Sequence, residues 1–181
     1  MPSLAIEVIM TLVIVAMMGA FWIFIQRRRS DRLKSRFGPE YDRVIQEHGK
    51  RWRAEAVLET REKRVEGLHI RSLTHSDRDH FAQAWHADQA RFVDDPKGAV
   101  TEADLLVTEV MKARGYPVST LEQRVADISV DHPHVVENYR AAADIALRHK
   151  SGEATTEDLR QAMVYYRKLF EELLETSELT R

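Results

Sequence analysis

The chain opens with a long apolar run. Residues 4–25 are almost entirely apolar, and Glu7 is their only charged residue. At about 1.5 Å per residue, a helix over this stretch is about 33 Å long, enough to cross the hydrocarbon core of a bilayer. The run has no basic residues before it and no small-residue cleavage site after it, both of which a secretory signal peptide requires. We therefore expect a retained single transmembrane helix at residues 4–25, after a short N-terminus at residues 1–3.

Beyond residue 75, apolar residues recur at the three- and four-residue spacing of amphipathic helices. The clearest case follows Thr155 and Asp158, which have the spacing of a capping box. Its apolar stripe is Leu159, Ala162, Met163, Tyr166, Leu169, Phe170, Leu173 and Leu174. Weaker stripes over residues 76–94, 97–114, 119–128 and 131–150 complete a predicted bundle of four to five helices at residues 76–175. Residues 176–181 form a tail.

Capping residues mark the ends of these predicted helices. The expected caps are Ser76 with Asp79, Asp95 before Pro96, and Asp131 with Pro133 at helix starts, and Gly115 at a helix end.

Residues 26–75, between the apolar run and the bundle, are charged and only thinly apolar. Pro39 is placed to begin a new helix after Gly38, and Gly49 interrupts it. We interpret this segment as a basic juxtamembrane stretch followed by a helical stalk that is largely solvated but covered on one side, with residues 61–64 on a solvated face. Residues 68–73 alternate with period two, but one such run cannot form a sheet, so we expect an extended connector. The expected fold class is all-α.

Charge is distributed unevenly along the chain, although the net charge is only −2. Basic residues cluster directly after the apolar run, whereas acidic residues predominate in the distal part. The positive-inside rule then predicts a single-pass protein of the cell inner (plasma) membrane, with its N-terminus outside and its C-terminal domain cytoplasmic. The absence of cysteine is consistent with a reducing compartment. The residues expected to contact the anionic inner leaflet of the lipid bilayer are Arg27, Arg28, Arg29, Arg32, Lys34 and Arg36.

Several short stretches together carry a resemblance. They are RFGPEYDRV (36–44), ARFVDDP (90–96), RGYP (114–117), DHP (131–133) and YR (139–140). The pattern resembles an uncharacterised family of short bacterial single-span membrane proteins. This resemblance implies a shared fold and topology and carries no activity.

The residue types that carry chemistry do not form a motif. His80 and His86 are six residues apart, so they point in different directions on a helix and cannot share a metal as an i, i+4 pair does. His132 and His134 flank a proline at an expected helix start. No nucleophile elbow, phosphate loop or dinucleotide motif is present, and the nearly balanced charge does not indicate nucleic acid. We expect no catalytic residue, no metal, no cofactor and no nucleic-acid partner.

The corners around Arg91, Arg114 and Tyr116 are the candidate interaction surface, because Arg and Tyr are favoured at interface hot spots. The interpretation that follows is a membrane-tethered adaptor or regulatory module with an unidentified protein partner. One alternative is an enzyme that uses Asp and His residues near His80 or His132. Another is a structural membrane protein that self-associates through the anchor and the stalk, with Ala16 and Ala20 as a small-residue face on which a second helix could pack in a homodimer.

Overall fold

The computed structural model describes residues 2–175, which form eight α-helices and no strand. The all-α prediction is confirmed for this part of the chain, while Met1 and the predicted tail, residues 176–181, lie outside the described residues. The helices are α1 (Pro2–Phe37), α2 (Pro39–His48), α3 (Arg51–Glu66), α4 (His75–Arg91), α5 (Pro96–Ala113), α6 (Leu121–Asp131), α7 (Val136–Lys150) and α8 (Thr156–Glu175).

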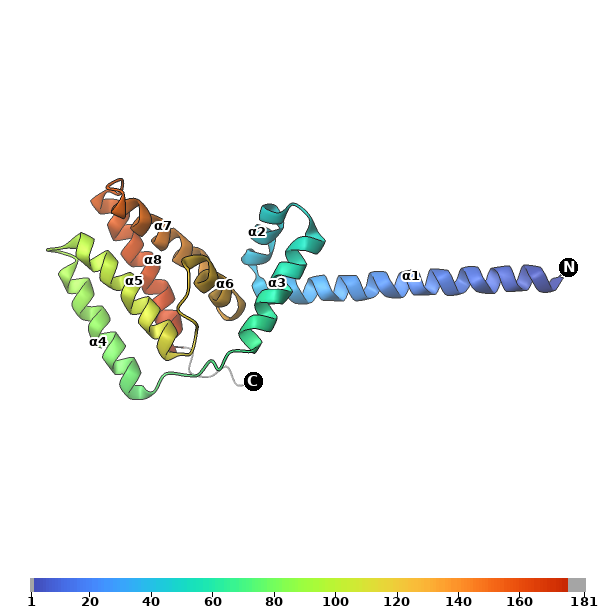
Figure 1. The fold of residues 1–181 in the computed structure, drawn as a ribbon, viewed down its shortest axis with the longest axis horizontal. Coiled ribbons are helices and arrows are strands. Elements are labelled where there is room, and N and C mark those ends of the chain that lie inside the picture. Colours follow the sequence, from blue (N-terminus) through green and yellow to red (C-terminus); the bar gives the residue numbers. More distant parts are fainter. Residues whose placement is uncertain (1, 176–181) are drawn as a thin grey trace.

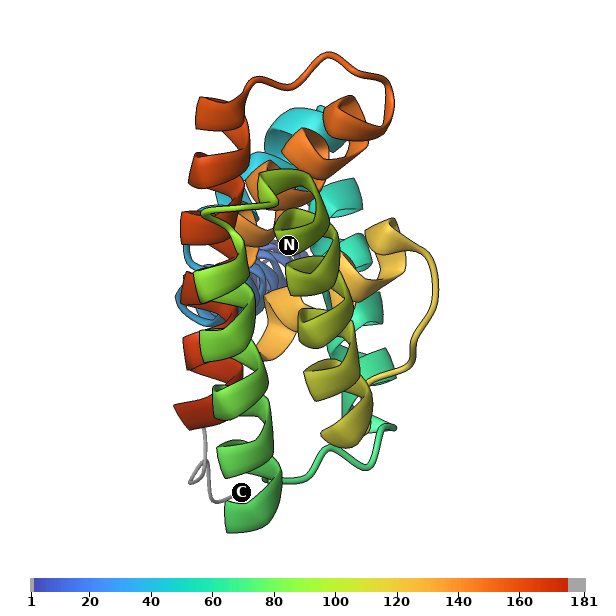
Figure 2. The same cartoon turned by 90° about the vertical axis from the view of Figure 1, so that its left-hand side faces the viewer.

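The helices form a compact bundle from which α1 projects as one long rod (Figure 1). Helices α2 and α3 pack around the base of α1, which also contacts α6 of the α4–α8 bundle. Figure 2 looks at the bundle along α1 and shows α4, α5 and α8 running side by side. Helix α8 packs against α5 and α7, so the C-terminal helix closes the bundle.

The apolar stripe of α8 is confirmed as core. Phe170 is 1% exposed and stacks on Trp85 of α4, with ring centroids 4.6 Å apart. The buried residues of α8 are Leu159, Ala162, Met163, Tyr166, Leu169, Phe170 and Leu173. They pack against the buried apolar residues of α5. Because each of these helices buries one face, its apolar residues recur with the helical period in the sequence.

A second core lies at the base of α1, and it corrects the prediction of a solvated stalk. Leu33 and Phe37 of α1 are fully buried, and they pack with apolar residues of α2 and α3 and with Val130 of α6. The contributors from α2 and α3 are Tyr41, Val44, Ala54, Leu58 and Val65. A few apolar residues on each of α1, α2 and α3 are enough to form this core because the three helices contribute to it together. Residues 29–75 therefore belong to the folded domain, whereas residues 26–28 lie on the projecting part of α1.

The charged run at residues 61–64 is a solvated face only in part: Lys63 and Arg64 are exposed, whereas the other two side chains are largely buried. Glu62 is 5% exposed and Arg61 is half-buried, because both side chains form ion pairs with neighbouring helices. Charged residues can be buried in this way only when each finds a partner.

Three of the predicted helix boundaries are confirmed. The Asp95 carboxylate accepts a hydrogen bond from the Gly98 amide, 2.9 Å away, and caps α5. Thr155 and Asp158 exchange the two hydrogen bonds of a capping box before α8. Gly115 has φ = +94° and ends α5 in a Schellman turn, in which the Tyr116 amide donates to the Met111 carbonyl.

Two predicted boundaries are wrong. Helix α4 is capped by Thr74 with Asp77, two residues before the expected Ser76 and Asp79, since both pairs fit the same sequence pattern. Asp131 does not begin a helix but is the last residue of α6, where its carboxylate accepts a hydrogen bond from the Tyr116 hydroxyl.

The extended connector predicted at residues 68–73 is confirmed: these residues form no strand. A single backbone hydrogen bond from the Arg71 amide to the Arg114 carbonyl fastens it to the end of α5.

No helix within residues 2–175, as described, combines the length and the low polarity needed to cross a membrane. The span expected at residues 4–25 stays a prediction.

Candidate interaction surfaces

The basic residues expected at the lipid surface divide into two groups. Arg29 binds Glu59 of α3, with Nη2 2.6 Å from Oε2, and Arg32 binds Glu62 at 3.1 Å. Arg36 lies 3.6 Å from the same Glu62 carboxylate. These three arginines tie α1 to α3, and the acids of α3 partly offset their charge, although the side chains of Arg32 and Arg36 stay exposed.

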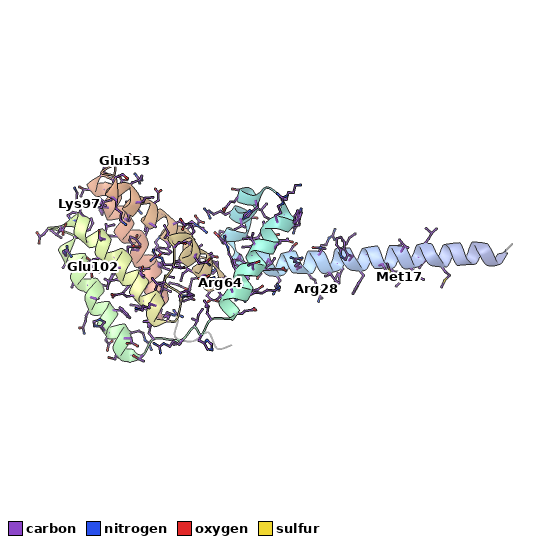
Figure 3. All side chains as sticks on the ribbon, viewed as in Figure 1. Met17, Arg28, Arg64, Lys97, Glu102 and Glu153 are labelled. Carbon is purple, nitrogen blue, oxygen red and sulfur yellow. The ribbon has the colours of Figure 1, made fainter. Side chains whose placement is uncertain are left out.

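The other three, Arg27, Arg28 and Lys34, are exposed. The Arg28 guanidinium lies over the ring of Phe24, 4.8 Å from its centroid. Figure 3 shows Arg28 and Met17 projecting from the free part of α1. Arg27, Arg28 and Lys34 are thus the members of the predicted set that remain available to an anionic surface.

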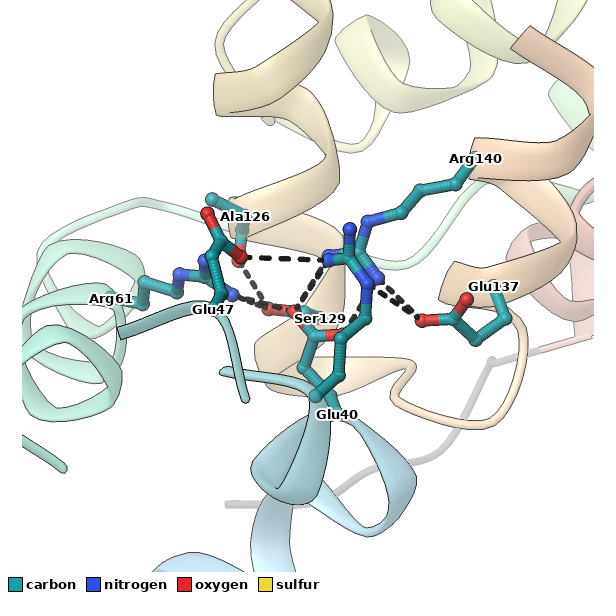
Figure 4. Close-up of polar contacts among 8 residues, drawn as sticks. Glu40, Glu47, Arg61, Ala126, Ser129, Glu137 and Arg140 are labelled. Atoms are coloured by element: carbon teal, nitrogen blue, oxygen red, sulfur yellow. Dashed lines mark hydrogen bonds and ion pairs between the residues drawn. The ribbon is translucent and has the colours of Figure 1, made fainter. Parts of the chain in front are cut away.

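A buried ion cluster around Glu40 joins three helices (Figure 4). Glu40 in α2 is fully buried, and both of its oxygens accept hydrogen bonds of 2.6 Å from Arg140 of α7. Arg61 of α3 donates to the same carboxylate at 2.8 Å. Burial opposes ionisation of Glu40, but the hydrogen bonds and charges of Arg140 and Arg61 outweigh it, so its pKa is lowered. A carboxylate saturated in this way cannot act as a general base, and its role is to hold α2 and α3 on the bundle.

Glu55 forms a second buried polar junction, between α1, α2 and α3. Its Oε1 accepts hydrogen bonds from the hydroxyls of Ser30, at 2.5 Å, and Tyr41, at 2.8 Å, and from Arg51 Nε at 3.0 Å. Burial again opposes ionisation, and the three donors more than compensate, so the pKa of Glu55 is lowered. Sequence reasoning missed Glu40 and Glu55 because their partners on other helices lie far along the chain, and Arg51, four residues before Glu55, does not by itself indicate a buried junction.

Two members of the predicted interaction surface are buried, which contradicts that prediction. Arg114 is 5% exposed and donates from Nη1 to the Leu173 carbonyl at the end of α8, 2.8 Å away. Tyr116 is 2% exposed, and burial raises the pKa of its hydroxyl, which donates to Asp131. Both residues fasten the α5 corner to the rest of the bundle. Arg91 is exposed, as expected, but pairs with Asp95 at 2.7 Å.

The histidines do not converge. His132 is buried, and its Nδ1 lies 3.1 Å from Glu172, while burial lowers its pKa. His80, His86 and His134 are exposed. Over the described part of the chain, no group of three or more His, Cys, Asp or Glu side chains is placed to hold a metal ion.

The largest exposed apolar surface is on α1. Between Leu12 and Ile25 its large apolar side chains are 47–68% exposed. Exposed apolar residues on the rest of the molecule are scattered, and they include Trp52, Val93 and Leu147. Contiguous apolar surface of this size is rare on monomeric soluble proteins and marks an interaction site.

An open groove lies between α3 and α6. Its apolar lining includes Ala56, Val57 and Ala126, and Arg64 lies on its wall, held by a hydrogen bond of 3.0 Å to the buried Asp127. Figure 3 places Arg64 at the junction of α3 with the bundle. The groove has a mixed apolar and cationic character.

No known family model matches this sequence, and no curated protein or solved structure shows significant similarity to it. The resemblance to a family of short single-span membrane proteins stays a prediction.

Proposed function

We propose that this protein is a membrane-anchored adaptor: α1 enters a lipid bilayer, and the helical domain at its base binds another protein. The observation that carries the proposal is the continuous exposed apolar surface of α1 between Leu12 and Ile25. Removing one large apolar side chain from water contributes roughly 1.5–3 kcal/mol. The many exposed apolar side chains of α1 together strongly favour burial of this helix in a bilayer or against other helices.

The charges beside this surface support the bilayer over a soluble partner. Arg27, Arg28 and Lys34 remain exposed directly after the apolar stretch, where anionic headgroups would meet them. The same basic flank favours an inner-membrane protein with its N-terminus outside and the domain on the cytoplasmic side.

The α3–α6 groove supports the adaptor part of the proposal. An apolar floor with small residues, Ala56 and Ala126, lets a helix approach closely, and the exposed Arg64 would pair with an acidic side chain on it. An amphipathic helix bearing such an acid is a common form of protein ligand.

Membrane fractionation of cells that express the full chain tests the anchor. The native protein should stay with the membranes after extraction at alkaline pH, and Val15→Arg combined with Met18→Arg should release it. Leu147→Arg is the matched control, because Leu147 is equally exposed but lies on the bundle. If the double variant stays in the membrane fraction, the anchor proposal is wrong.

A photo-reactive amino acid at Ala56 tests the groove. A specific adduct that forms at Ala56, and not at the control position Leu147, supports a partner there. An adduct with a second copy of this chain would instead favour the self-association alternative, and the absence of any adduct would count against the groove.

A further inference from the structure

The turn between α2 and α3 presents an aromatic and basic corner, residues 50–53. Trp52 is 63% exposed, which is unusual for so large a side chain. The Arg53 guanidinium lies 5.2 Å from the centroid of its ring. With Lys50 and Arg51, the corner carries three cations; the nearest acid in sequence is Glu55, two residues after Arg53, and it pairs with Arg51.

The backbone and side chains around this corner fix its position. Gly49 has φ = +67° and ends α2 in a left-handed turn, with its amide bonded to the Ile45 carbonyl. Arg51 Nε donates to the Tyr41 hydroxyl at 3.1 Å and to Glu55. Arg51 therefore holds the start of α3 against α2, whereas Lys50, Trp52 and Arg53 are exposed to solvent.

The contacts between α1 and α3 show which way the corner faces. Glu55 binds Ser30, whereas Glu62 binds Arg32 and lies near Arg36, so the two helices run in the same direction away from the N-terminus. Trp52 precedes Glu55 by three residues, about 4.5 Å along a helix. It therefore lies on the side of the Ser30–Glu55 contact that faces the apolar stretch of α1. Figure 1 shows the α2–α3 turn on the side from which α1 projects.

We infer that residues 50–53 rest in the headgroup layer of the bilayer that α1 enters, with Trp52 in the interface and Arg53 facing anionic lipids. Tryptophan is enriched at the membrane–water interface, and basic side chains next to it bind anionic headgroups. The occupant of this surface is thus a bilayer that contains anionic lipid. The inference rests on the proposed membrane anchor and adds a second point of attachment.

The absence of cysteine from the chain allows a direct test by site-directed spin labelling of the full protein in vesicles. Labels are placed singly at Met17→Cys, Lys50→Cys and Leu147→Cys, and collisions with oxygen and with a water-soluble nickel chelate are measured. The vesicles are phosphatidylcholine alone or a mixture with phosphatidylglycerol. We expect position 17 to be shielded from nickel in both, position 147 to be accessible in both, and position 50 to be shielded most in the anionic vesicles.

A paired substitution shows whether the corner itself causes the shielding. Trp52→Ser with Arg53→Gln, in the Lys50→Cys background, should restore nickel collisions at position 50 to the level at position 147. The control, Leu147→Ser with Arg148→Gln, should leave position 50 shielded. Shielding that survives loss of Trp52 and Arg53 would overturn the inference.

The labels also separate the two proposals. If position 17 is shielded while position 50 is as accessible as position 147, the anchor stands and the corner does not contact lipid. If position 17 is itself accessible to nickel, the anchor fails, and the corner's contact with the same bilayer fails with it.

Discussion

Replacing Glu40 by Ala should strongly destabilise the domain. Glu40 is fully buried between Arg61 and Arg140, whose side chains are only 16% and 18% exposed. The substitution leaves two poorly hydrated guanidinium groups without their carboxylate. Removing one partner of a buried ion pair typically costs about 3–5 kcal/mol. We expect a loss near the lower value, because both arginines keep other contacts: Arg140 with Glu137, at 2.6 Å, and Arg61 with Ser129, at 3.4 Å.

The loss should depend on pH. The pKa of Glu40 is lowered in the folded protein, so its stabilising contribution is present above the ordinary carboxyl pKa of 4.5 and is lost as the pH falls through the folded-state value. The difference in unfolding free energy between the native protein and Glu40→Ala should therefore be largest near neutral pH and shrink in acid.

Urea unfolding of the full chain in mild detergent, followed by circular dichroism, measures this difference. Glu47→Ala is the control, because Glu47 lies on the same helix with a 54% exposed side chain and should change stability little. A double-mutant cycle with Arg140→Ala isolates the pair. If Glu40→Ala costs less than about 1 kcal/mol at neutral pH, the cluster does not hold α2 and α3 on the bundle, and the reasoning is refuted.

Three further predictions concern stability in the same assay. Phe170→Ala should cost on the order of 3–5 kcal/mol, since it empties a core position, whereas the neighbouring exposed Glu171→Ala should cost little. Leu33→Ala should cost on the order of 2–5 kcal/mol, and a cost near zero would favour the original interpretation of these residues as a solvated stalk. Burial raises the pKa of Asp88 to about 6, with help from the charge of Glu102, so stability should fall as the pH rises from about 4 to 6. Asp88→Asn should remove that fall, on the order of 2–3 kcal/mol, and an unchanged pH profile would contradict this account.

The bundle could be predicted because its signals are local. The stripe from Leu159 to Leu173 repeats with the helical period, and Thr155 with Asp158 marks its start three residues apart. The turn at Gly115 could be predicted for the same reason: its left-handed backbone conformation favours glycine, which the sequence shows directly.

The base of α1 was misjudged because its stability comes from contacts distant in sequence. Its apolar residues are too sparse to mark a core within any one helix. They form one only when α1, α2, α3 and Val130 of α6 meet. Arg140 lies 100 residues after Glu40, so no local pattern could pair them. Arg114 and Tyr116 were misplaced for a related reason: residue type suggested a surface, whereas the partners that bury them lie on α6 and α8.

Helix α1 has neither glycine nor proline between Ala20 and Phe37, the residues at which helices usually kink. Its last turns are fixed in the domain by Leu33 and Phe37 and by the arginines that bind α3. The segment from Ala20 to Phe37 and the bundle therefore turn as one body. Any change in the tilt of this segment, about 27 Å long, swings the bundle through an arc. A force applied to α1 at Ala20 is thus delivered to the domain as a rotation.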